Sequence, residues 1–268
     1  MKESLENILL IDRNDNGIIR LTLNDLDNKN ALSGLMMQKL INVITESSKD
    51  NSIKVIVIAS TGNVFCSGHN LKEINEARKD ADDGESYYLE LFKTCSSLMQ
   101  LIVNCSKPVI AEVNGIATAA GCQLVASCDL AVSSNSAKFA TPGVNIGLFC
   151  STPMVALSRS VSKKDSMKML LTGDMINADE AKRISLINDF VSEKELTKSV
   201  MDLAERISKK SASVISIGKE AFYKQSELNL FDAYEYTSKV MTANTLNENA
   251  KEGIDAFLEK RDPNWRDM

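Results

Sequence analysis

The sequence contains one histidine, His69, so a nucleophile that depends on an imidazole base could use only this residue. The alternative, which is the more frequent case for a lone histidine, is a side chain that takes no part in chemistry. No G-x-x-x-x-G-K-S/T segment occurs, and no G-x-G-x-x-G segment opens a helix after a strand. The sequence therefore lacks the usual signals of nucleotide hydrolysis and of hydride transfer from a dinucleotide.

Two loops rich in small residues each follow an apolar run and are the best candidates for a binding site. They are residues 65–71 (Phe-Cys-Ser-Gly-His-Asn-Leu) and residues 114–123 (Asn-Gly-Ile-Ala-Thr-Ala-Ala-Gly-Cys-Gln). The second loop runs into the start of an expected helix, where free backbone N–H groups and the positive end of the helix dipole could hold a developing oxyanion. An ordinary tight turn explains the same pattern equally well.

Six cysteines are spread along the chain without a C-x-x-C pair and without histidine partners at metal-ligand spacing. They are Cys66, Cys95, Cys105, Cys122, Cys128 and Cys150. We therefore expect no metal site. Reduced thiols of this kind predict a cytoplasmic protein.

Composition and charge exclude several classes of protein. With 44% hydrophobic residues, 25% charged residues and a net charge of −5, the chain is typical of a globular protein. Its Lys and Arg residues are scattered, so we expect no nucleic-acid partner. Residues 1–7 are not typical of a targeting signal, and no apolar run approaches the ~20 residues of a membrane span, so no membrane partner is expected.

Apolar runs predict the elements that must position the two loops. Strands are expected at residues 8–11, 17–23, 55–59, 109–113 and 130–133, the first two forming a hairpin. Helices are expected from Ser33 to about Asp50 and at residues 86–104 and 121–128. This alternation predicts βαβ units whose ligands bind beyond the C-terminal strand ends, so the two loops should form one site. The pattern from Lys194 onward is helical, which predicts a core of residues 1–193 and a helical region of residues 194–268.

Several segments resemble one known family in their order and spacing. They are residues 30–33, 65–72, 107–115, 120–124, 128–131, 139–142, 171–173 and 257–261. Together they extend over nearly the whole chain, and on them the sequence is similar to the enoyl-CoA hydratase/isomerase family, also called the crotonase family. The resemblance implies an α/β fold, a crotonase-like spiral of ββα units with a C-terminal helical trimerisation region. It also implies an acyl-CoA thioester as ligand, with coenzyme A as part of the substrate rather than a permanently bound cofactor, and a homotrimer or dimer of trimers.

The resemblance also implies roles for individual residues. The oxyanion hole of the family corresponds to the backbone N–H groups of His69 and Ala120, which would stabilise a thioester enolate. Residues that match the coenzyme A path are Lys29, Ala31, Ser67 and Leu71, and residues that match a C-terminal segment near the adenine are Phe257 and Lys260. For Lys29, a solvated lysine in a polar loop is the alternative.

The sequence departs from the family where hydration needs acid/base groups. Hydratases of this family use two glutamates, and the matching positions hold Gln123 and Gly143. Gln is a neutral amide that orients water without taking its proton, and Gly has no side chain. Cys150 lies where relatives often have an acid or a tyrosine, so it is a candidate proton donor or nucleophile, with simple packing as the alternative.

These departures make ordinary hydration doubtful and leave other chemistry open. Each lost acid or base typically costs ~10²–10⁴ in rate. Decarboxylation of a malonyl-type thioester needs no protein base to begin, and the methylmalonyl-CoA decarboxylase of the family is similar at residues 68–69, 141–142 and 144–147. Thioester hydrolysis by an ordered water is also open. The alternative is a catalytically silent member that binds acyl-CoA or a protein partner.

Overall fold

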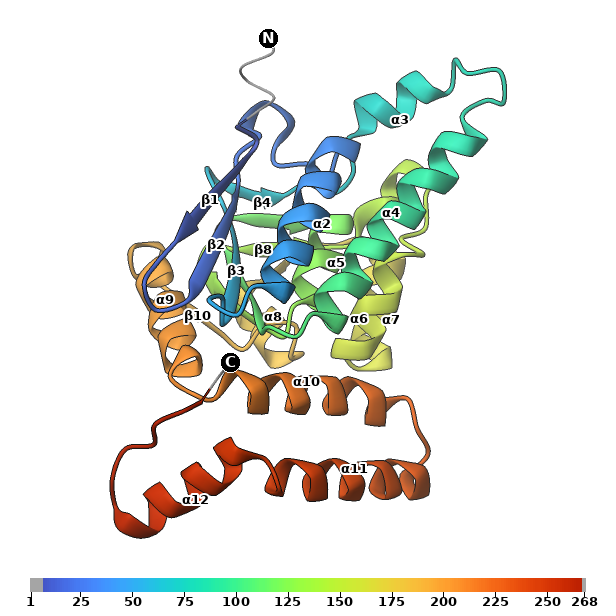
Figure 1. Cartoon of the computed structure of the whole chain (residues 1–268). Coiled ribbons are helices and arrows are strands. Elements are labelled where there is room, and N and C mark those ends of the chain that lie inside the picture. Colours follow the sequence, from blue (N-terminus) through green and yellow to red (C-terminus); the bar gives the residue numbers. More distant parts are fainter. Residues whose placement is uncertain (1–6, 267–268) are drawn as a thin grey trace.

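The computed structural model describes residues 7–266, and the larger of its two sheets has six strands (Figure 1). Their order across the sheet is β1 (Leu9–Arg13), β2 (Ile18–Leu23), β3 (Val55–Ser60), β5 (Val109–Val113), β7 (Leu130–Ser134) and β10 (Asp189–Val191). The expected hairpin is confirmed, because β1 pairs with β2 in antiparallel fashion. The other neighbours are parallel.

The sequence analysis expected no targeting signal in residues 1–7. The structure describes only Asn7 of this segment.

A second sheet contains shorter strands that alternate along the chain with those of the first. Its order is β4 (Val64–Cys66), β6 (Ile116–Thr118), β8 (Lys138–Ala140) and β9 (Ile176–Asn177). Strand pairs β3/β4, β5/β6 and β7/β8 thus each contribute one strand to each sheet before the chain turns into a helical segment. This repeat is the ββα spiral, so the expected fold class is confirmed.

The sequence analysis treated β4 and β6 as parts of loops, and that interpretation was wrong. Each strand has only three residues, Val-Phe-Cys in β4 and Ile-Ala-Thr in β6. A run that short carries no readable period-2 signal. Pairing with neighbouring strands, which the sequence does not show, is what makes these segments extended.

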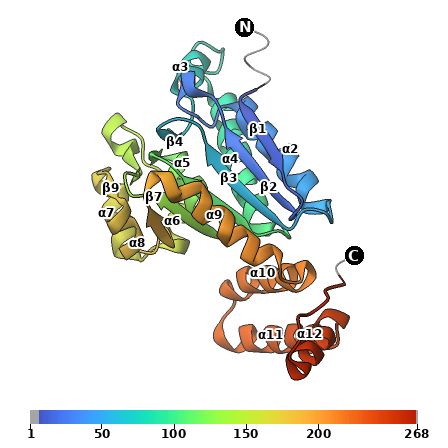
Figure 2. The ribbon, with the colours of Figure 1, turned by 90° about the vertical axis from the view of Figure 1, so that its left-hand side faces the viewer.

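The larger sheet is buried on both faces because its side chains alternate between two clusters. Val55 and Val57 of β3 pack against helix α9 (Glu193–Ser208), whereas Ile56 and Ile58 point into the main core. Figure 2 shows α9 running across this face of the sheet. Helix α9 therefore packs as part of the core, although nearly all of it lies in the region 194–268 that was expected to be a separate helical region. The division into a core and a helical C-terminal region stays a prediction.

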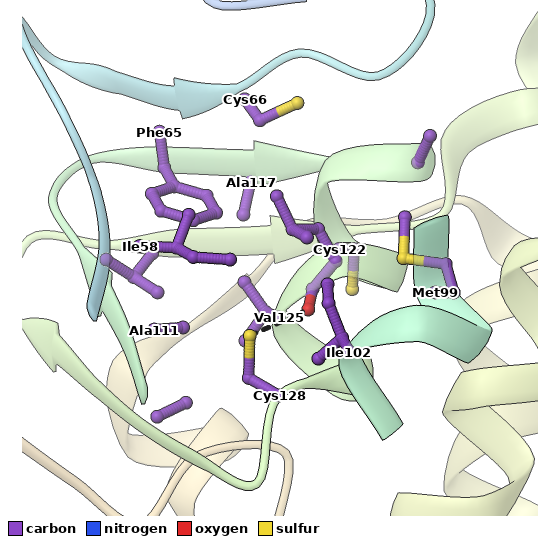
Figure 3. Close-up of a cluster of buried hydrophobic side chains, with 14 of the residues drawn as sticks. Ile58, Phe65, Cys66, Met99, Ile102, Ala111, Ala117, Cys122, Val125 and Cys128 are labelled. Carbon is purple, nitrogen blue, oxygen red and sulfur yellow. Dashed lines mark hydrogen bonds between the residues drawn. The ribbon is translucent and has the colours of Figure 1, made fainter. Parts of the chain in front are cut away.

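The main core lies between the two sheets and three helices. These are α2 (Gly34–Lys49), α4 (Glu85–Asn104) and α5 (Ala120–Ser127). Helix α2 begins where expected, because the Ser33 side chain accepts a hydrogen bond from the Met36 amide. Figure 3 shows Met99 and Ile102 of α4 beside Cys122 and Val125 of α5. This packing fixes α5, and with it the end of the second glycine-containing loop.

Helices α10 (Ala212–Ser226), α11 (Leu230–Thr245) and α12 (Glu248–Glu259) form a layer at one end of the molecule (Figures 1 and 2). A buried ion pair joins this layer to the core, because Lys219 Nζ lies 2.6 Å from Asp129 Oδ2. The same carboxylate accepts hydrogen bonds from Tyr223 OH and the Val109 amide. The cluster stabilises the attachment of α10 just beyond the C-terminal end of α5.

The remaining elements complete the spiral and its edges. They are η1 (Leu26–Asn28), α3 (Leu71–Ala77), η2 (Pro142–Ile146), α6 (Pro153–Ser160), α7 (Lys163–Thr172) and α8 (Ala178–Arg183). In the part of the chain that the structure describes, no helix combines the length and the apolar character of a membrane span.

Candidate functional site

The two glycine-containing loops are in direct contact, as expected. Gly68 has a φ of +97°, and a Cβ added to it would lie 2.9 Å from the Ala119 Cβ and 3.4 Å from the Ala120 nitrogen. A Cβ on Gly121 would overlap the carbonyl group of Cys66. The Thr118 hydroxyl also donates to the Ser67 carbonyl at 3.1 Å. Glycine at these two positions therefore permits an approach that brings His69 and Ala120 to one place.

Two backbone N–H groups remain free at this contact. Within residues 7–266, neither the His69 amide nor the Ala120 amide donates a hydrogen bond. Ala120 is the first residue of α5, and the preceding Ala119 has a φ of +51° and a ψ of −117°, an unfavourable conformation for a residue with a Cβ. Free donors at a helix N-terminus favour a partly negative oxygen.

The His69 side chain is held in one tautomer. Its Nδ1 lies 3.2 Å from the Leu32 carbonyl oxygen, which can only accept, so Nδ1 carries the proton. The ring packs edge-on against Phe92 of α4, with centroids 5.6 Å apart. Its Nε2 is buried without a hydrogen-bond partner. Burial lowers the pKa of the imidazole, so His69 is neutral at pH 7.

Two polar side chains beside His69 were missed by the sequence analysis. Glu73 accepts hydrogen bonds from Asn70 Nδ2 and from Tyr87 OH, both at 3.1 Å. Burial and the neighbouring carboxylate raise the pKa of Tyr87 to about 12, so the phenol stays protonated. The signal that could have found Glu73 is its place three residues after the helix-capping Asn70, which is typical of a capping box.

The positions expected to face the reacting carbons are neutral. Gln123 is buried, and its Oε1 lies 3.7 Å from the Cys95 thiol. Gly143 is buried beneath Leu148 and Cys150, and a Cβ there would meet the Leu148 carbonyl oxygen and lie 2.9 Å from Cys150 Sγ. The structure therefore leaves no room for a side chain at residue 143 unless the loop moves.

Cys150 is a protonated thiol in this environment. Burial raises its pKa, and a hydrogen bond from the Gly143 amide opposes that shift only in part. Cys122 and Cys95 are buried nearby in the same core, and burial raises the pKa of each to about 12. These side chains are thiols rather than thiolates at neutral pH, which argues against a nucleophilic role.

A groove of about 1440 Å³ lies between α4, α5, α6 and α10. Gln123, Ser96 and Met99 contribute to its wall, and His69 and Ala120 do not. Gln123 is the groove-lining residue of α5 that lies nearest in sequence to the free Ala120 amide. In the described part of the chain, no three His, Cys, Asp or Glu side chains are grouped to hold a metal ion.

The residues expected along the coenzyme A path separate into two groups. The Ser67 amide donates to the Lys29 carbonyl at 3.2 Å, buried Ala31 follows in the same segment, and exposed Leu71 opens α3. Phe257 and Lys260 end α12 instead, at the opposite end of the molecule from β4 and α3 (Figures 1 and 2). Within one chain, Lys29, Ala31, Ser67 and Leu71 therefore lie around the loop that carries the His69 amide. Phe257 and Lys260 of the same chain do not.

Comparison with known proteins identifies relatives over the whole length. The family model described as enoyl-CoA hydratase/isomerase matches residues 13–268. Enoyl-CoA hydratase domain-containing protein 3, mitochondrial, of Xenopus laevis is 47% identical over 257 residues, covering 96% of this chain and 86% of that protein. The crystal structure of human enoyl Coenzyme A hydratase domain-containing protein 3 superposes with a TM-score of 0.92 at 46% identity, covering 97% of this chain and 100% of that one. An enoyl-CoA hydratase structure from Mycobacterium smegmatis gives 0.91 at 43% identity, covering 96% and 98%. The resemblance seen in the sequence is confirmed.

The same comparison corrects the expected cytoplasmic location. The relatives from Xenopus laevis, Mus musculus and Homo sapiens, at 47–48% identity, are all named mitochondrial. The inference from cysteine usage was wrong because reduced thiols indicate a reducing compartment and do not distinguish one such compartment from another.

The contact between the two loops generates a stability prediction. Gly121→Ala should lower the free energy of unfolding by about 1–3 kcal/mol, because the new methyl group overlaps the Cys66 carbonyl. Gly218→Ala is the matched control, since α10 leaves open space there and the better helix former should stabilise by about 0.5–1 kcal/mol. Urea denaturation followed by circular dichroism measures both. Equal stability of the two variants would contradict the close loop contact.

Proposed function

Because the chain belongs to the enoyl-CoA hydratase/isomerase (crotonase) family, we propose that it binds an acyl-CoA thioester with the carbonyl oxygen between the His69 and Ala120 amides. The observation that supports this is the pair of free N–H groups that the Gly68 contact brings together. Lys29, Ala31, Ser67 and Leu71 would then line the path of the coenzyme A moiety.

Two such donors stabilise negative charge that develops on the thioester oxygen. The charge appears in an enolate or in a tetrahedral intermediate, and one oxyanion donor is typically worth on the order of 10²–10³ in rate. Only the backbone N–H groups of residues 69 and 120 take part in holding the oxyanion. We therefore infer an enzyme of the lyase or hydrolase type acting on acyl-CoA.

Ordinary hydration is disfavoured by the groups around the proposed carbonyl. Addition of water needs one group to take a proton from water and another to deliver a proton to the α-carbon. Gln123 cannot exchange a proton, and residue 143 has neither a side chain nor room for one. Decarboxylation of a malonyl-type thioester and hydrolysis of the thioester both remain compatible with the two amides.

Binding at the two amides has a spectroscopic signature. Bound butyryl-CoA should show a thioester C=O stretch at lower frequency than free butyryl-CoA, because two N–H donors polarise the carbonyl. Ala120→Pro removes one donor at the first helical position, where proline is tolerated, and should lose much of the shift. Lys163→Pro, at the first position of α7, is the matched control and should keep it. Infrared difference spectroscopy measures the shift.

The two possible failures have different meanings. Tight binding without a frequency shift would contradict the oxyanion assignment and favour a catalytically silent acyl-CoA-binding protein. No binding of butyryl-CoA would contradict the proposed ligand itself.

Hydration of crotonyl-CoA should be slow in the unaltered protein. Each missing acid or base costs roughly 10²–10⁴ in rate, so turnover should lie several orders of magnitude below that of a two-glutamate relative. Gln123→Glu alone should raise the rate only slightly, and adding Gly143→Glu should help only if the loop over Gly143 moves. The loss of enoyl absorbance measures the rate. Robust hydration that survives repurification would show that another residue supplies the acid/base function.

We further propose that the protein assembles as a homotrimer or a dimer of trimers. Large apolar side chains are exposed on α10 to α12, including Phe222, Leu230, Phe231, Phe257 and Leu258. Phe257 and Lys260 can reach a coenzyme A moiety bound near Lys29 only if a neighbouring copy supplies them.

Light scattering should therefore give at least three times the 29.4 kDa of one chain. Lys260→Asn, which keeps a residue suited to the left-handed conformation at that position, should weaken coenzyme A binding. Lys251→Asn on the same helix is the control and should not. A stable monomer in solution would contradict the proposed assembly.

A further inference from the structure

The imidazole of His69 contains a polar atom that nothing in the described chain uses. Nδ1 donates to the Leu32 carbonyl, so the lone pair of Nε2 is an acceptor. Nε2 is buried and has no partner. Buried polar atoms are nearly always paired, so an unpaired one in a folded protein calls for an explanation, and a role in catalysis is one of them. This acceptor belongs to the same residue whose amide is one of the two free donors.

The contact with Phe92 relates the ring to helix α4, which lines the groove. Phe92, which the ring contacts, lies four and seven residues before Ser96 and Met99, and these spacings place the three on one face of α4. Ser96 and Met99 line the groove together with Gln123. The imidazole therefore contacts the same face of α4 that lines the groove, about one helical turn before the first groove residue, Ser96.

We propose that His69 Nε2 is the proton acceptor for a water molecule that hydrolyses the bound thioester. This inference rests on the proposed function, because the amides of His69 and Ala120 must hold the carbonyl. Water gives a proton to Nε2 while its oxygen bonds to the carbonyl carbon, and the two amides hold the resulting oxyanion. When the intermediate collapses, the C–S bond breaks and the coenzyme A sulfur takes the proton from the imidazolium. The products are a carboxylic acid and free coenzyme A, and water is the only co-reactant.

The surroundings of the ring keep it neutral and therefore basic. Its contacts come from the Leu32 carbonyl, from Phe92 of α4 and, electrostatically, from Glu73 of α3. The hydrogen bond from Tyr87 engages the Glu73 carboxylate, so that charge only partly opposes the effect of burial. Burial raises the pKa of nearby Cys66 and of Tyr87 to about 12, so neither titrates in the range where the imidazole does.

Water must reach Nε2 for this step. Nε2 is covered in the structure, and Phe92, which packs against the ring, is 37% exposed. The proposed step therefore requires this phenyl group to rotate toward solvent and uncover the ring. Phe92 is thus part of the proposal, and it supplies a control that separates packing from proton transfer.

The test compares hydrolysis of butyryl-CoA and octanoyl-CoA by the unaltered protein, His69→Gln and Phe92→Ala. Gln keeps the backbone amide and a donor for the Leu32 carbonyl but cannot take a proton, so turnover should fall about 10²–10⁴-fold. Affinity for a thioether analogue of butyryl-CoA should stay the same, because the two amides remain. Phe92→Ala should keep or increase turnover, since it opens Nε2. Loss of thioester absorbance measures hydrolysis, and calorimetry measures affinity.

The pH dependence supplies a second readout, whose sign follows from the lowered pKa. Neutral imidazole is the active form, so turnover should be constant at high pH and fall as the pH drops through a value below the ordinary 6.5 of histidine. His69→Gln should lack this acid limb over about pH 5 to 8. A merely structural role for the ring would leave the shape of the profile unchanged.

Three results would overturn the proposal while leaving acyl-CoA binding intact. They are thioether binding without hydrolysis by the unaltered protein, an acid limb that persists in His69→Gln, and an equal loss of turnover in Phe92→Ala. Absence of thioether binding would instead contradict the proposed function itself.

Discussion

The structure of the candidate site depends on one close approach between two stretches of backbone. Gly68 lies against Ala119 and Ala120, and Gly121 lies against the Cys66 carbonyl, at distances that no side chain would permit. The approach leaves two N–H groups without partners and holds Ala119 in an unfavourable conformation. Strain of this kind persists only where surrounding structure enforces it, and here the ββα spiral does so. Strands β4, β6 and β8 are neighbours in one sheet, and the Ala140 carbonyl at the end of β8 accepts the Ala119 amide.

The interior next to this contact is apolar, rich in thiols and without charge. Burial keeps Cys95, Cys122 and Cys150 protonated, and Gln123 presents a neutral amide among them. In such surroundings the two N–H donors are the main source of stabilisation for a developing negative charge, because water does not compete with them. The nearest charged groups are engaged by partners, Glu73 by Asn70 and Tyr87, and Asp129 by Lys219. Polar pairing thus fixes the frame around the two free N–H groups.

The sequence by itself determined the family, the main strands and helices, and the two loops whose contact forms the candidate site. The runs at 55–59 and 109–113 were readable because strands buried on both faces are continuously apolar, and Ser33 marked the start of α2 because its hydroxyl caps the helix. The identities of Gln123 and Gly143 also came from the sequence alone. The short strands β4 and β6 did not, because three residues show no period.

Only the tertiary structure decided which groups are free and which are engaged. That His69 Nδ1 is engaged while Nε2 is not depends on Leu32 and Phe92, which lie 37 and 23 residues away in the chain. That residue 143 has no room for a side chain depends on Leu148 and Cys150 folding back over it. That α12, which ends next to Lys260, lies at the opposite end of the molecule from β4 and α3 depends on how α10 is attached through Asp129 and Lys219. Hydrogen-bond saturation, burial and distance are properties of contacts between segments remote in sequence, and no local pattern encodes them.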